Sequence, residues 1–283
     1  MALNARDLMM IESGMGLARE FRFIPASDMA GVVEAEGDSI RRFGPGERVI
    51  TTVRPSWIDG PSSGSAAGPS YRTLGGYYPG ALAEYVCFPE DWFTAAPATL
   101  DDLPASTLPV AGLMAWFLLI EQGRLKAAET VLVPGTGGVA IFAGQTTRMH
   151  GAEVIVSSGS DDKLHRARAL GAVHLINRNK TDVVREVQAL TPTAPILVTA
   201  PTIQGIVTGH RRALEDLVRA VDRSRLKPSI DRRYSFDKLP EAPEPPCSRV
   251  HSGKLSSMSW RNDAVGCARK AHCASPRSPA KAD

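Results

Sequence analysis

The chain has 283 residues, 43% of them hydrophobic and 22% charged, and its formal net charge is +3 at pH 7. This composition is typical of a globular protein with a sizeable core and one or two domains. Arg6, Asp7 and Glu12 stand where a secretory signal needs an apolar segment, and residues 103–120, the longest uncharged stretch, contain two prolines. We therefore expect no secretory leader, no membrane span and a cytoplasmic location.

The positive charge is concentrated in a C-terminal tail. Residues 243–283 hold seven basic and three acidic side chains, so the rest of the chain is slightly acidic. This distribution predicts no nucleic-acid-binding face on the body of the protein. Cys247, Cys267 and Cys273 lie in the tail at spacings that match no standard zinc site. The polar sequence of the tail, broken by proline and serine, predicts disorder.

The first hundred residues predict short strands joined by turns. The strand candidates are an alternating segment at 31–36, a Pro-Gly turn that leads into a strand at 43–50, and a segment at 80–89. Between them, residues 55–78 are rich in glycine, serine and proline, which predicts a mobile surface loop.

From Leu108 onward helices and strands alternate. Helices are predicted over residues 111–122, 138–149, 161–170 and 182–190, with Ser160 and Thr181 at N-cap positions, and strands over 131–133, 154–157 and 173–176. This order predicts an α/β fold with a parallel sheet. A fourth strand is predicted at 203–207, and an amphipathic helix at 211–223 with Leu214, Leu217, Val218 and Val221 on one face.

A glycine turn joins the first of these strands to its helix. The turn reads Gly135-x-Gly137-x-x-Ala140, and this spacing suits a dinucleotide pyrophosphate. The first glycine permits the sharp turn, the second permits close approach of a phosphate, and the small third residue lets the helix pack on its strand. We expect the backbone amides at the start of the helix to meet the pyrophosphate, namely those of Thr136, Gly137, Gly138 and Val139. The alternative is a glycine-rich loop of some other α/β protein.

The residues at the end of the strand predicted at 154–157 indicate whether the dinucleotide is NAD(H) or NADP(H). An acidic residue is expected about 20 residues after the turn for NAD, but the chain has Ser157 and Ser158 there, followed by Lys163. Hydroxyl groups and a cation suit a 2′-phosphate, so the sequence favours NADP(H) over NAD(H), and Asn177 could line the adenosine. Alternatively, the serines are turn and cap residues and Lys163 is a solvated surface charge.

Several segments together resemble the medium-chain dehydrogenase/reductase superfamily, in particular its zinc-free, quinone-oxidoreductase-like branch. The resemblance covers about residues 2–242 and is carried by segments 3–7, 24–31, 43–49, 80–85, 108–113, the glycine turn, 163–177, 225–228 and 236–237. It implies a GroES-like, β-rich catalytic domain (1–108), an incomplete Rossmann cofactor domain with a doubly wound parallel sheet (109–208), a return to the catalytic domain (209–242) and the disordered tail (243–283). The implied activity is hydride transfer between a nicotinamide and a small enone, quinone, carbonyl or alcohol.

The resemblance also indicates which residues face the substrate and the nicotinamide. Asn4 and Asp7 are the candidate catalytic residues, although Asp7 could instead brace a loop. Gly209 and Arg211 match a nicotinamide-side segment of the family, although Arg211 could be an ordinary residue at the start of a helix. Ala5 and Met114 replace a tyrosine and a threonine that are common near the nicotinamide.

The chain departs from the family in its metal ligands and its length. Zinc-using relatives carry a cysteine near Asn4 and a His-Glu pair near Asp28, where this chain has no metal ligand set, so we expect catalysis without zinc. Strands that precede Asn4 in relatives are absent, and a helix and two strands are expected to be missing near 191–195. A complete sheet has six strands, which leaves a truncated, non-catalytic relative as the alternative function. The lost sheet edge also makes the family's homodimer doubtful.

Overall fold

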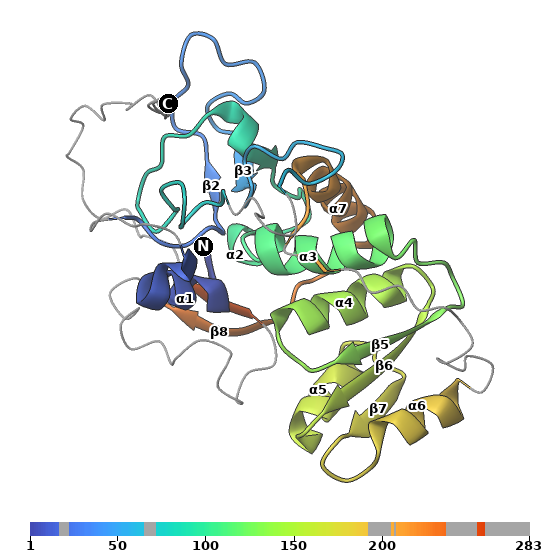
Figure 1. Cartoon of the computed structure of the whole chain (residues 1–283). Coiled ribbons are helices and arrows are strands. Elements are labelled where there is room, and N and C mark those ends of the chain that lie inside the picture. The colour runs from blue at the N-terminus through green and yellow to red at the C-terminus, as the bar shows by residue number, and fades with distance from the viewer. Residues whose placement is uncertain (17–22, 65–71, 192–204, 207, 236–253, 258–283) are drawn as a thin grey trace.

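The computed structural model describes residues 1–16, 23–64, 72–191, 205, 206, 208–235 and 254–257. Figure 1 shows two lobes with the helices α3 (Leu113–Trp116) and α4 (Gly138–Met149) between them. The lower lobe contains a parallel sheet, and the upper lobe contains an antiparallel sheet and α7 (Arg211–Ser224). Within the described ranges, no helix is long and apolar enough to cross a membrane.

The antiparallel sheet of the upper lobe has three short strands. These are β2 (Ala30–Val32), β3 (Arg48–Thr51) and β4 (Phe93–Ala95), in the order β2-β3-β4. The prediction of strands near 31–36 and 43–50 is confirmed at shorter lengths. A second sheet has the order β1-β9-β8 and consists of β1 (Ala2–Leu3), β9 (Lys254–Ser257) and β8 (Ile230–Tyr234). The prediction of disorder throughout 243–283 is therefore wrong for β9; the rest of the tail lies outside the described residues.

The segment at 80–89 was predicted as a strand, and this is wrong. Residues 80–82 instead run beside 24–26, held by hydrogen bonds from Gly80 N to Ile24 O (2.7 Å) and from Ala81 N to Ala26 O (2.9 Å). A Cβ atom on Gly80 would lie only 2.2 Å from the carbonyl oxygens of Pro25 and Ala26. The two backbones approach too closely for any residue with a side chain, so glycine is required here.

A helix, α1 (Ala5–Ser13), forms where only strands and turns were predicted. It begins with a capping box in which the Asp7 carboxylate accepts a hydrogen bond from the Asn4 amide (2.8 Å). It ends at Gly14, whose φ of +69° closes the helix in a left-handed conformation. A 3₁₀ turn, Gly14–Gly16, follows. Short 3₁₀ and α-helical turns also form at Glu90–Trp92 and α2 (Asp102–Ala105).

The predicted parallel sheet is confirmed. It comprises β5 (Thr130–Pro134), β6 (Glu153–Ser158) and β7 (His174–Asn177) in the order β5-β6-β7, and α4, α5 (Asp161–Ala169) and α6 (Val183–Leu190) alternate with these strands. The predicted helix at 111–122 lies within one helical segment, in which π-helical stretches Leu108–Gly112 and Phe117–Gln122 flank α3.

Of the two N-caps predicted in the lower lobe, the one for α5 is confirmed and the one for α6 is wrong. Ser160 caps α5 by accepting from the Lys163 amide, as predicted. Thr181 does not cap α6, because the carboxylate of Asp182 accepts from the Val184 and Arg185 amides instead. A charged carboxylate is the stronger acceptor at the positive end of a helix.

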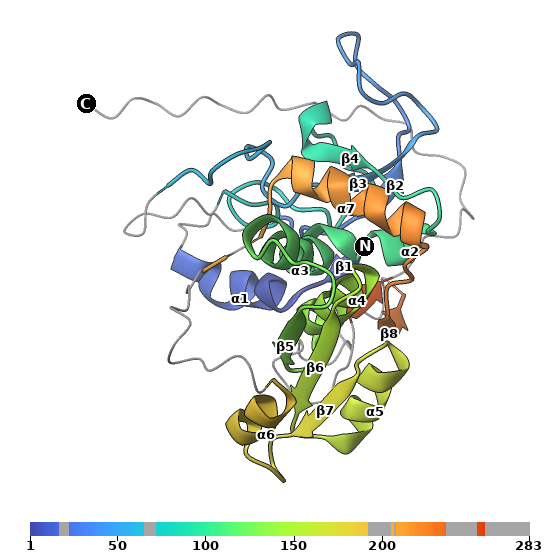
Figure 2. The ribbon, with the colours of Figure 1, turned by 90° about the vertical axis from the view of Figure 1, so that its right-hand side faces the viewer.

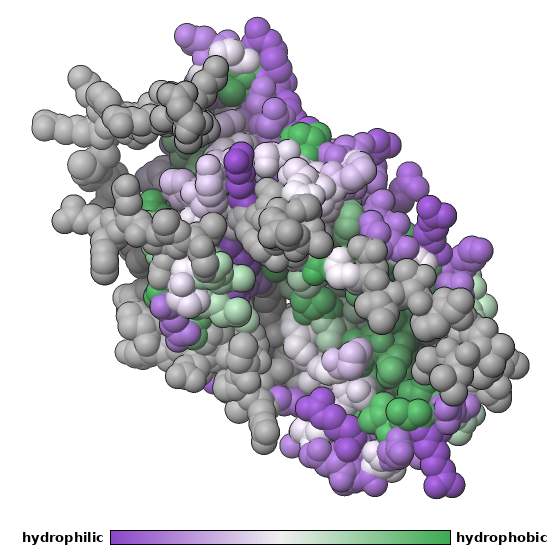
Figure 3. All heavy atoms as spheres, viewed as in Figure 1, coloured by the Kyte–Doolittle hydropathy of each residue, from purple (hydrophilic) through white to green (hydrophobic). Residues whose placement is uncertain are grey.

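The predicted fourth strand is only partly covered by the structure. Gly205 and Ile206 lie in no strand, while 203, 204, 207 and the junction 192–195 lie outside the described residues. Within the described part, β5 pairs only with β6. Apolar side chains are exposed on this lobe (Figure 3), among them Leu132 of β5 (41%) and Val184 (58%) and Leu190 (38%) of α6.

The helix α7 joins the upper lobe to the helical segment 108–122. Its apolar face is buried as predicted: Leu214, Leu217 and Val221 are at most 1% exposed. Figure 2 shows α7 lying across the strands β3 and β4, and its buried face also contacts α3. Burial of one apolar face of an amphipathic helix is the main source of its stability.

The carboxylate of Asp222 ties α7 to the loop that follows β4. It accepts hydrogen bonds from the amides of Ala98 (3.1 Å) and Thr99 (2.9 Å) and from the Thr99 hydroxyl (2.7 Å). Burial alone would raise the pKa of Asp222, but these hydrogen bonds outweigh burial and lower it below its usual value.

Because the folded state has the lower pKa, the stabilisation by Asp222 is present above about pH 4 and disappears as the pH falls through the folded-state pKa. We expect Asp222→Asn to lower the free energy of unfolding by about 1 kcal/mol at neutral pH and by much less near pH 3. Urea unfolding at both pH values measures this, with Asp38→Asn, an exposed carboxylate, as the control. An equal loss at both pH values would contradict the assignment.

Candidate functional site

The glycine turn lies where β5 ends and α4 begins. Gly135 has a φ of +119° and donates its amide to Ser157 O at the end of β6 (2.8 Å). Gly137 is the N-cap of α4 and, lacking a side chain, gives the helix no side-chain cap. The first turn of an α-helix leaves its amides without intrahelical acceptors. The turn therefore presents helix amides at the carboxyl edge of a parallel sheet, where ligands bind in open α/β folds.

The described residues leave space in front of the turn. Among them, a Cβ atom built on Gly135 or on Gly137 would meet no heavy atom within 4 Å. Gly144, two turns further along α4, differs because its Cβ would touch Val154 at 3.8 Å. Gly135 needs to be glycine for its backbone angle, whereas Gly137 has a φ of −77° that any residue adopts. Neither conformation nor packing accounts for Gly137, whereas approach of a bulky anion would.

The residues predicted to contact the ribose lie beside this turn. Ser157 and Ser158 end β6 and are each 4% exposed. Ser158 Oγ accepts weakly from the Ser160 amide (3.4 Å), so part of the turn-and-cap alternative holds for these serines. Lys163 is in the first turn of α5. The structure thus brings Ser158 and Lys163 to the same edge of the sheet as Gly135.

Asn177 ends β7 and braces the neighbouring loop. Its Nδ2 donates to Asp161 Oδ1 (2.6 Å), and Lys180 Nζ binds the other oxygen of Asp161 (2.6 Å). The hydrogen bonds from Lys180 and Asn177 lower the pKa of Asp161 below its usual value. The Asn177 side chain therefore links the end of β7 to the start of α5, and its amide nitrogen already donates a hydrogen bond.

The two predicted catalytic residues have different surroundings. Asp7 is 5% exposed, and its carboxylate closes the capping box of α1 and lies 3.3 Å from the Arg6 guanidinium. These contacts match the alternative of a bracing role. Asn4 Nδ2 is buried and, among the described residues, has no hydrogen-bond acceptor. An unpaired buried donor is unfavourable unless a ligand or water satisfies it.

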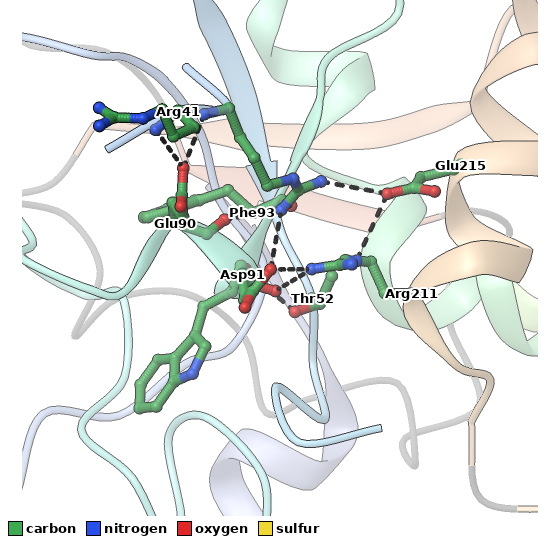
Figure 4. Close-up of polar contacts among 9 residues, drawn as sticks. Arg41, Thr52, Glu90, Asp91, Phe93, Arg211 and Glu215 are labelled. Carbon is green, nitrogen blue, oxygen red and sulfur yellow. Dashed lines mark hydrogen bonds and ion pairs between the residues drawn. The ribbon is translucent and has the colours of Figure 1, made fainter. Parts of the chain in front are cut away.

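Gly209 and Arg211 lie at the start of α7, away from the glycine turn in sequence. A Cβ atom on Gly209 would lie 2.8 Å from Leu113 and 2.9 Å from Phe117, so close packing requires glycine. The Arg211 guanidinium binds Asp91 Oδ1 (2.6 Å), and its Nε lies 3.4 Å from Glu215 Oε1 (Figure 4). Its charge is thus taken up by two carboxylates of the upper lobe.

Sequence reasoning missed the acidic partners of this helix. Asp91 Oδ1 binds Arg211 (Figure 4) and also lies 3.6 Å from Arg42 Nη1. The other nitrogen of that guanidinium, Arg42 Nη2, binds Glu215 at 3.2 Å. Only the Arg211–Glu215 spacing of four residues along one helix was a local signal. The Arg211–Asp91 and Arg42–Glu215 pairs are 120 and 173 residues apart in the chain.

The positions of zinc ligands in relatives carry a different donor set here. Asp28 is fully buried, accepts from Ser27 Oγ (3.0 Å) and lies 3.3 Å from the Val110 amide. Cys87 is exposed. Within the ranges that the structure describes, no three His, Cys, Asp or Glu side chains converge as a metal site. The donor chemistry at Asn4, Ser27 and Asp28 does not fit a catalytic zinc ion.

Comparison with known proteins agrees with this geometry. Residues 1–98 match the family model described as alcohol dehydrogenase GroES-like domain, and residues 138–200 match that described as zinc-binding dehydrogenase. A zinc-type alcohol dehydrogenase-like protein of Schizosaccharomyces pombe is 30% identical over 304 residues, which cover 90% of this chain and 87% of that protein. A crystal structure of a putative alcohol dehydrogenase from Sinorhizobium meliloti 1021 is 48% identical, with a TM-score of 0.87, over 91% of this chain and 88% of that one.

A more distant relative is the quinone oxidoreductase of Mus musculus. It is 27% identical over 167 residues, and the match covers 59% of this chain but only 44% of the mouse protein. The matches to the Schizosaccharomyces pombe protein and the Sinorhizobium meliloti structure each cover most of this chain and most of the relative. The match to the mouse enzyme covers only about half of each protein.

Proposed function

Since this chain belongs to the medium-chain dehydrogenase/reductase superfamily of NAD(P)-dependent oxidoreductases, we propose that it uses NADP(H), without zinc, to reduce or oxidise a small enone, quinone, carbonyl or alcohol. The observation that carries the proposal is the glycine turn at the carboxyl end of β5, which the described residues leave open, followed by the start of α4, whose N-cap Gly137 has no side chain. The turn fits a dinucleotide because its amides offer hydrogen bonds and its glycines leave room for the phosphates.

Different groups around the turn would bind different parts of the cofactor. The amides of Thr136, Gly137, Gly138 and Val139 would hold the pyrophosphate, and Ser157, Ser158 and Lys163 would hold the 2′-phosphate. When bound, the nicotinamide would supply the hydride in a reduction and accept it in an oxidation. The protein's own contribution is to orient the two reactants and to exclude water from them.

Asn4 is the residue proposed to face the substrate oxygen. Its buried Nδ2 lacks an acceptor in the described structure, so it could donate to a carbonyl or enone oxygen as negative charge develops there. Asp7 would act through α1, by holding the backbone of Asn4 with its carboxylate. No step requires a metal ion.

The preference for NADP(H) can be tested at Lys163. We expect Lys163→Ala to weaken NADPH binding roughly 10- to 100-fold and to leave NADH binding nearly unchanged, because only NADPH carries the 2′-phosphate and a hydrogen bond to a charged group contributes about 1.5–3 kcal/mol. Fluorescence titration with both nucleotides measures the two affinities. Lys126→Ala is the control, since Lys126 precedes β5 at the opposite end of the strand. Equal losses for both nucleotides would argue against the 2′-phosphate contact.

A relative without catalytic activity is the second candidate. The exposure of Leu132, Val184 and Leu190 on the lower lobe favours it, because apolar side chains are normally covered in a complete sheet of this type. Titration with NADPH followed by assays with an enone and a quinone separates the two. Saturable binding with turnover supports the oxidoreductase, whereas saturable binding without turnover supports the non-catalytic relative. Folded protein that binds neither nucleotide would overturn the oxidoreductase and leave the non-catalytic relative, which needs no nucleotide.

A further inference from the structure

The loop after β3 is attached to the start of α7 through backbone hydrogen bonds. The amides of Arg211 and Arg212 donate to Trp57 O (3.0 Å) and Ile58 O (3.1 Å). These are two of the amides that the first turn of a helix leaves without intrahelical acceptors. Residues 55–60, which belong to the stretch predicted as a mobile loop, therefore cap this helix with their carbonyl groups, and we refer to them as the capping loop.

The next amide of α7 is capped by an imidazole nitrogen. The Ala213 amide donates to His210 Nδ1 (3.0 Å), and His210 is the N-cap of the helix and only 6% exposed. A backbone N–H group can only donate, so Nδ1 is the unprotonated nitrogen of the ring and the proton of the neutral imidazole is on Nε2. The usual N-caps, such as serine and asparagine, keep their acceptor oxygen at every ordinary pH, whereas a protonated histidine has no acceptor. His210 therefore caps α7 only in its neutral form.

The same imidazole packs against the capping loop. Its ring meets those of Trp57 (5.4 Å between centroids) and Phe117 (5.2 Å) edge-on, and Trp57 is 7% exposed. The indole Nε1 of Trp57 donates to Gly60 O (2.9 Å), which closes the turn of the loop. Edge-on aromatic contacts of this kind are specific in geometry as well as favourable. The position of the His210 ring therefore links the helix cap to the seat of the loop.

Charged groups of three elements surround this ring. Asp59 Oδ1 lies 3.6 Å from His210 Nε2, and Asp59 Oδ2 binds Arg212 Nη1 (2.8 Å). The hydrogen bond from Arg212 is the main cause that lowers the pKa of Asp59, so this carboxylate stays ionised above about pH 5. The other charged groups are Arg211 and Glu215 of α7, Glu121 of the helical segment 108–122, and Arg54, which stacks on Trp57 (4.4 Å to the ring centroid). Of the groups named here, the imidazole is the type that ordinarily changes charge between about pH 5 and 8.

Protonation of His210 removes more than it adds. An imidazolium leaves the buried Ala213 amide facing an N–H group, and a buried donor without an acceptor is costly. The new charge also lies at the positive end of α7, next to two arginines. The gain is an ion pair with Asp59, but that side chain is 48% exposed and already binds Arg212, and such surface pairs contribute little.

We infer that His210 is a pH-sensitive latch: the neutral imidazole holds the capping loop on the start of α7, and protonation opens the Ala213 cap and releases the loop. The inference is independent of the proposed function, because it concerns only the contacts between the loop, the imidazole and the helix. It predicts a local opening in mildly acidic solution that leaves the other end of α7 in place.

Hydrogen exchange at about pH 7.5 and about pH 5, on either side of the ordinary histidine titration, tests the latch. Rates are compared as protection factors, which remove the intrinsic effect of pH on exchange. The amides of Arg211, Arg212 and Ala213 should each lose about tenfold in protection at the lower pH, equivalent to about 1.4 kcal/mol. The internal control is the Thr99 amide, which donates to Asp222 in the last turn of α7 (2.9 Å) and should keep its protection. A fall confined to Ala213, or an equal fall at Thr99, would overturn the latch.

Two further measurements identify His210 as the titrating group. In His210→Asn the three amides should keep the same protection at both pH values, because asparagine is a favoured N-cap and does not titrate. The matched control is His174→Asn, which removes a partly exposed histidine of β7 and should retain the wild-type response. In the wild type, ring ¹⁵N shifts at about pH 7.5 should place the proton of His210 on Nε2, a readout that needs no variant. A proton on Nδ1, or a wild-type response in His210→Asn, would overturn the inference.

Discussion

Replacing Gly137 with aspartate should abolish NADPH binding while slightly stabilising the fold. Gly137 has a φ of −77° and ψ of −179°, which aspartate adopts without strain, and its Cβ would meet no atom of the described residues within 4 Å. Aspartate is a favoured N-cap and interacts well with the positive end of α4, so we expect a gain of a few tenths to about 1 kcal/mol in unfolding free energy.

The same carboxylate would stand where the pyrophosphate is proposed to bind. Two like charges about 4 Å apart repel by about 4 kcal/mol in a partly solvated site, so the NADPH affinity should fall by a hundredfold or more. Fluorescence titration and thermal unfolding measure both effects on one sample. A loss of binding together with a higher melting temperature cannot be ascribed to misfolding.

Gly144→Ala is the control on the same helix. Its Cβ would make an ordinary contact with Val154 at 3.8 Å, and alanine is more favourable than glycine in a helix by about 1 kcal/mol. We expect higher stability and unchanged NADPH affinity. If Gly137→Asp bound NADPH as well as the wild type does, the glycine turn would not be the phosphate site.

Leu217→Ala should destabilise the protein strongly. Leu217 is 1% exposed and belongs to the core between α7 and the helical segment 108–122, where its Cδ2 lies 3.3 Å from the position of a Cβ on Gly112. Removing a buried leucine side chain costs about 2–5 kcal/mol, because apolar surface is lost and a cavity remains. That is a large share of the total stability of about 5–15 kcal/mol that proteins have.

Urea unfolding measures this loss, and Leu118→Ala supplies the comparison. Leu118 follows Phe117 in the same helical segment but is 38% exposed, so we expect its removal to cost less than about 1 kcal/mol. Similar losses for the two variants would show that α7 does not anchor the core as the structure indicates.

Local sequence signals predicted the lower lobe because each signal is short in range. The apolar runs at β5, β6 and β7, the helical periodicity of α4 to α6, and the turn at Gly135 each depend on neighbours within a few residues. The helix α1 could also have been predicted from the sequence, because Asn4 and Asp7 have the spacing of a capping box. Their polarity suggested a functional site instead.

The sequence by itself determined the glycine turn, the parallel sheet and the amphipathic face of α7. Only the tertiary structure decided which charges meet. Asp59 and Arg212 are 153 residues apart, and Arg211 and Asp91 are 120 apart. No periodicity encodes such pairs, because they form only when a loop of the upper lobe packs on the end of a distant helix. The same packing buries Trp57 against Phe117 and turns a glycine- and proline-rich segment into a helix cap.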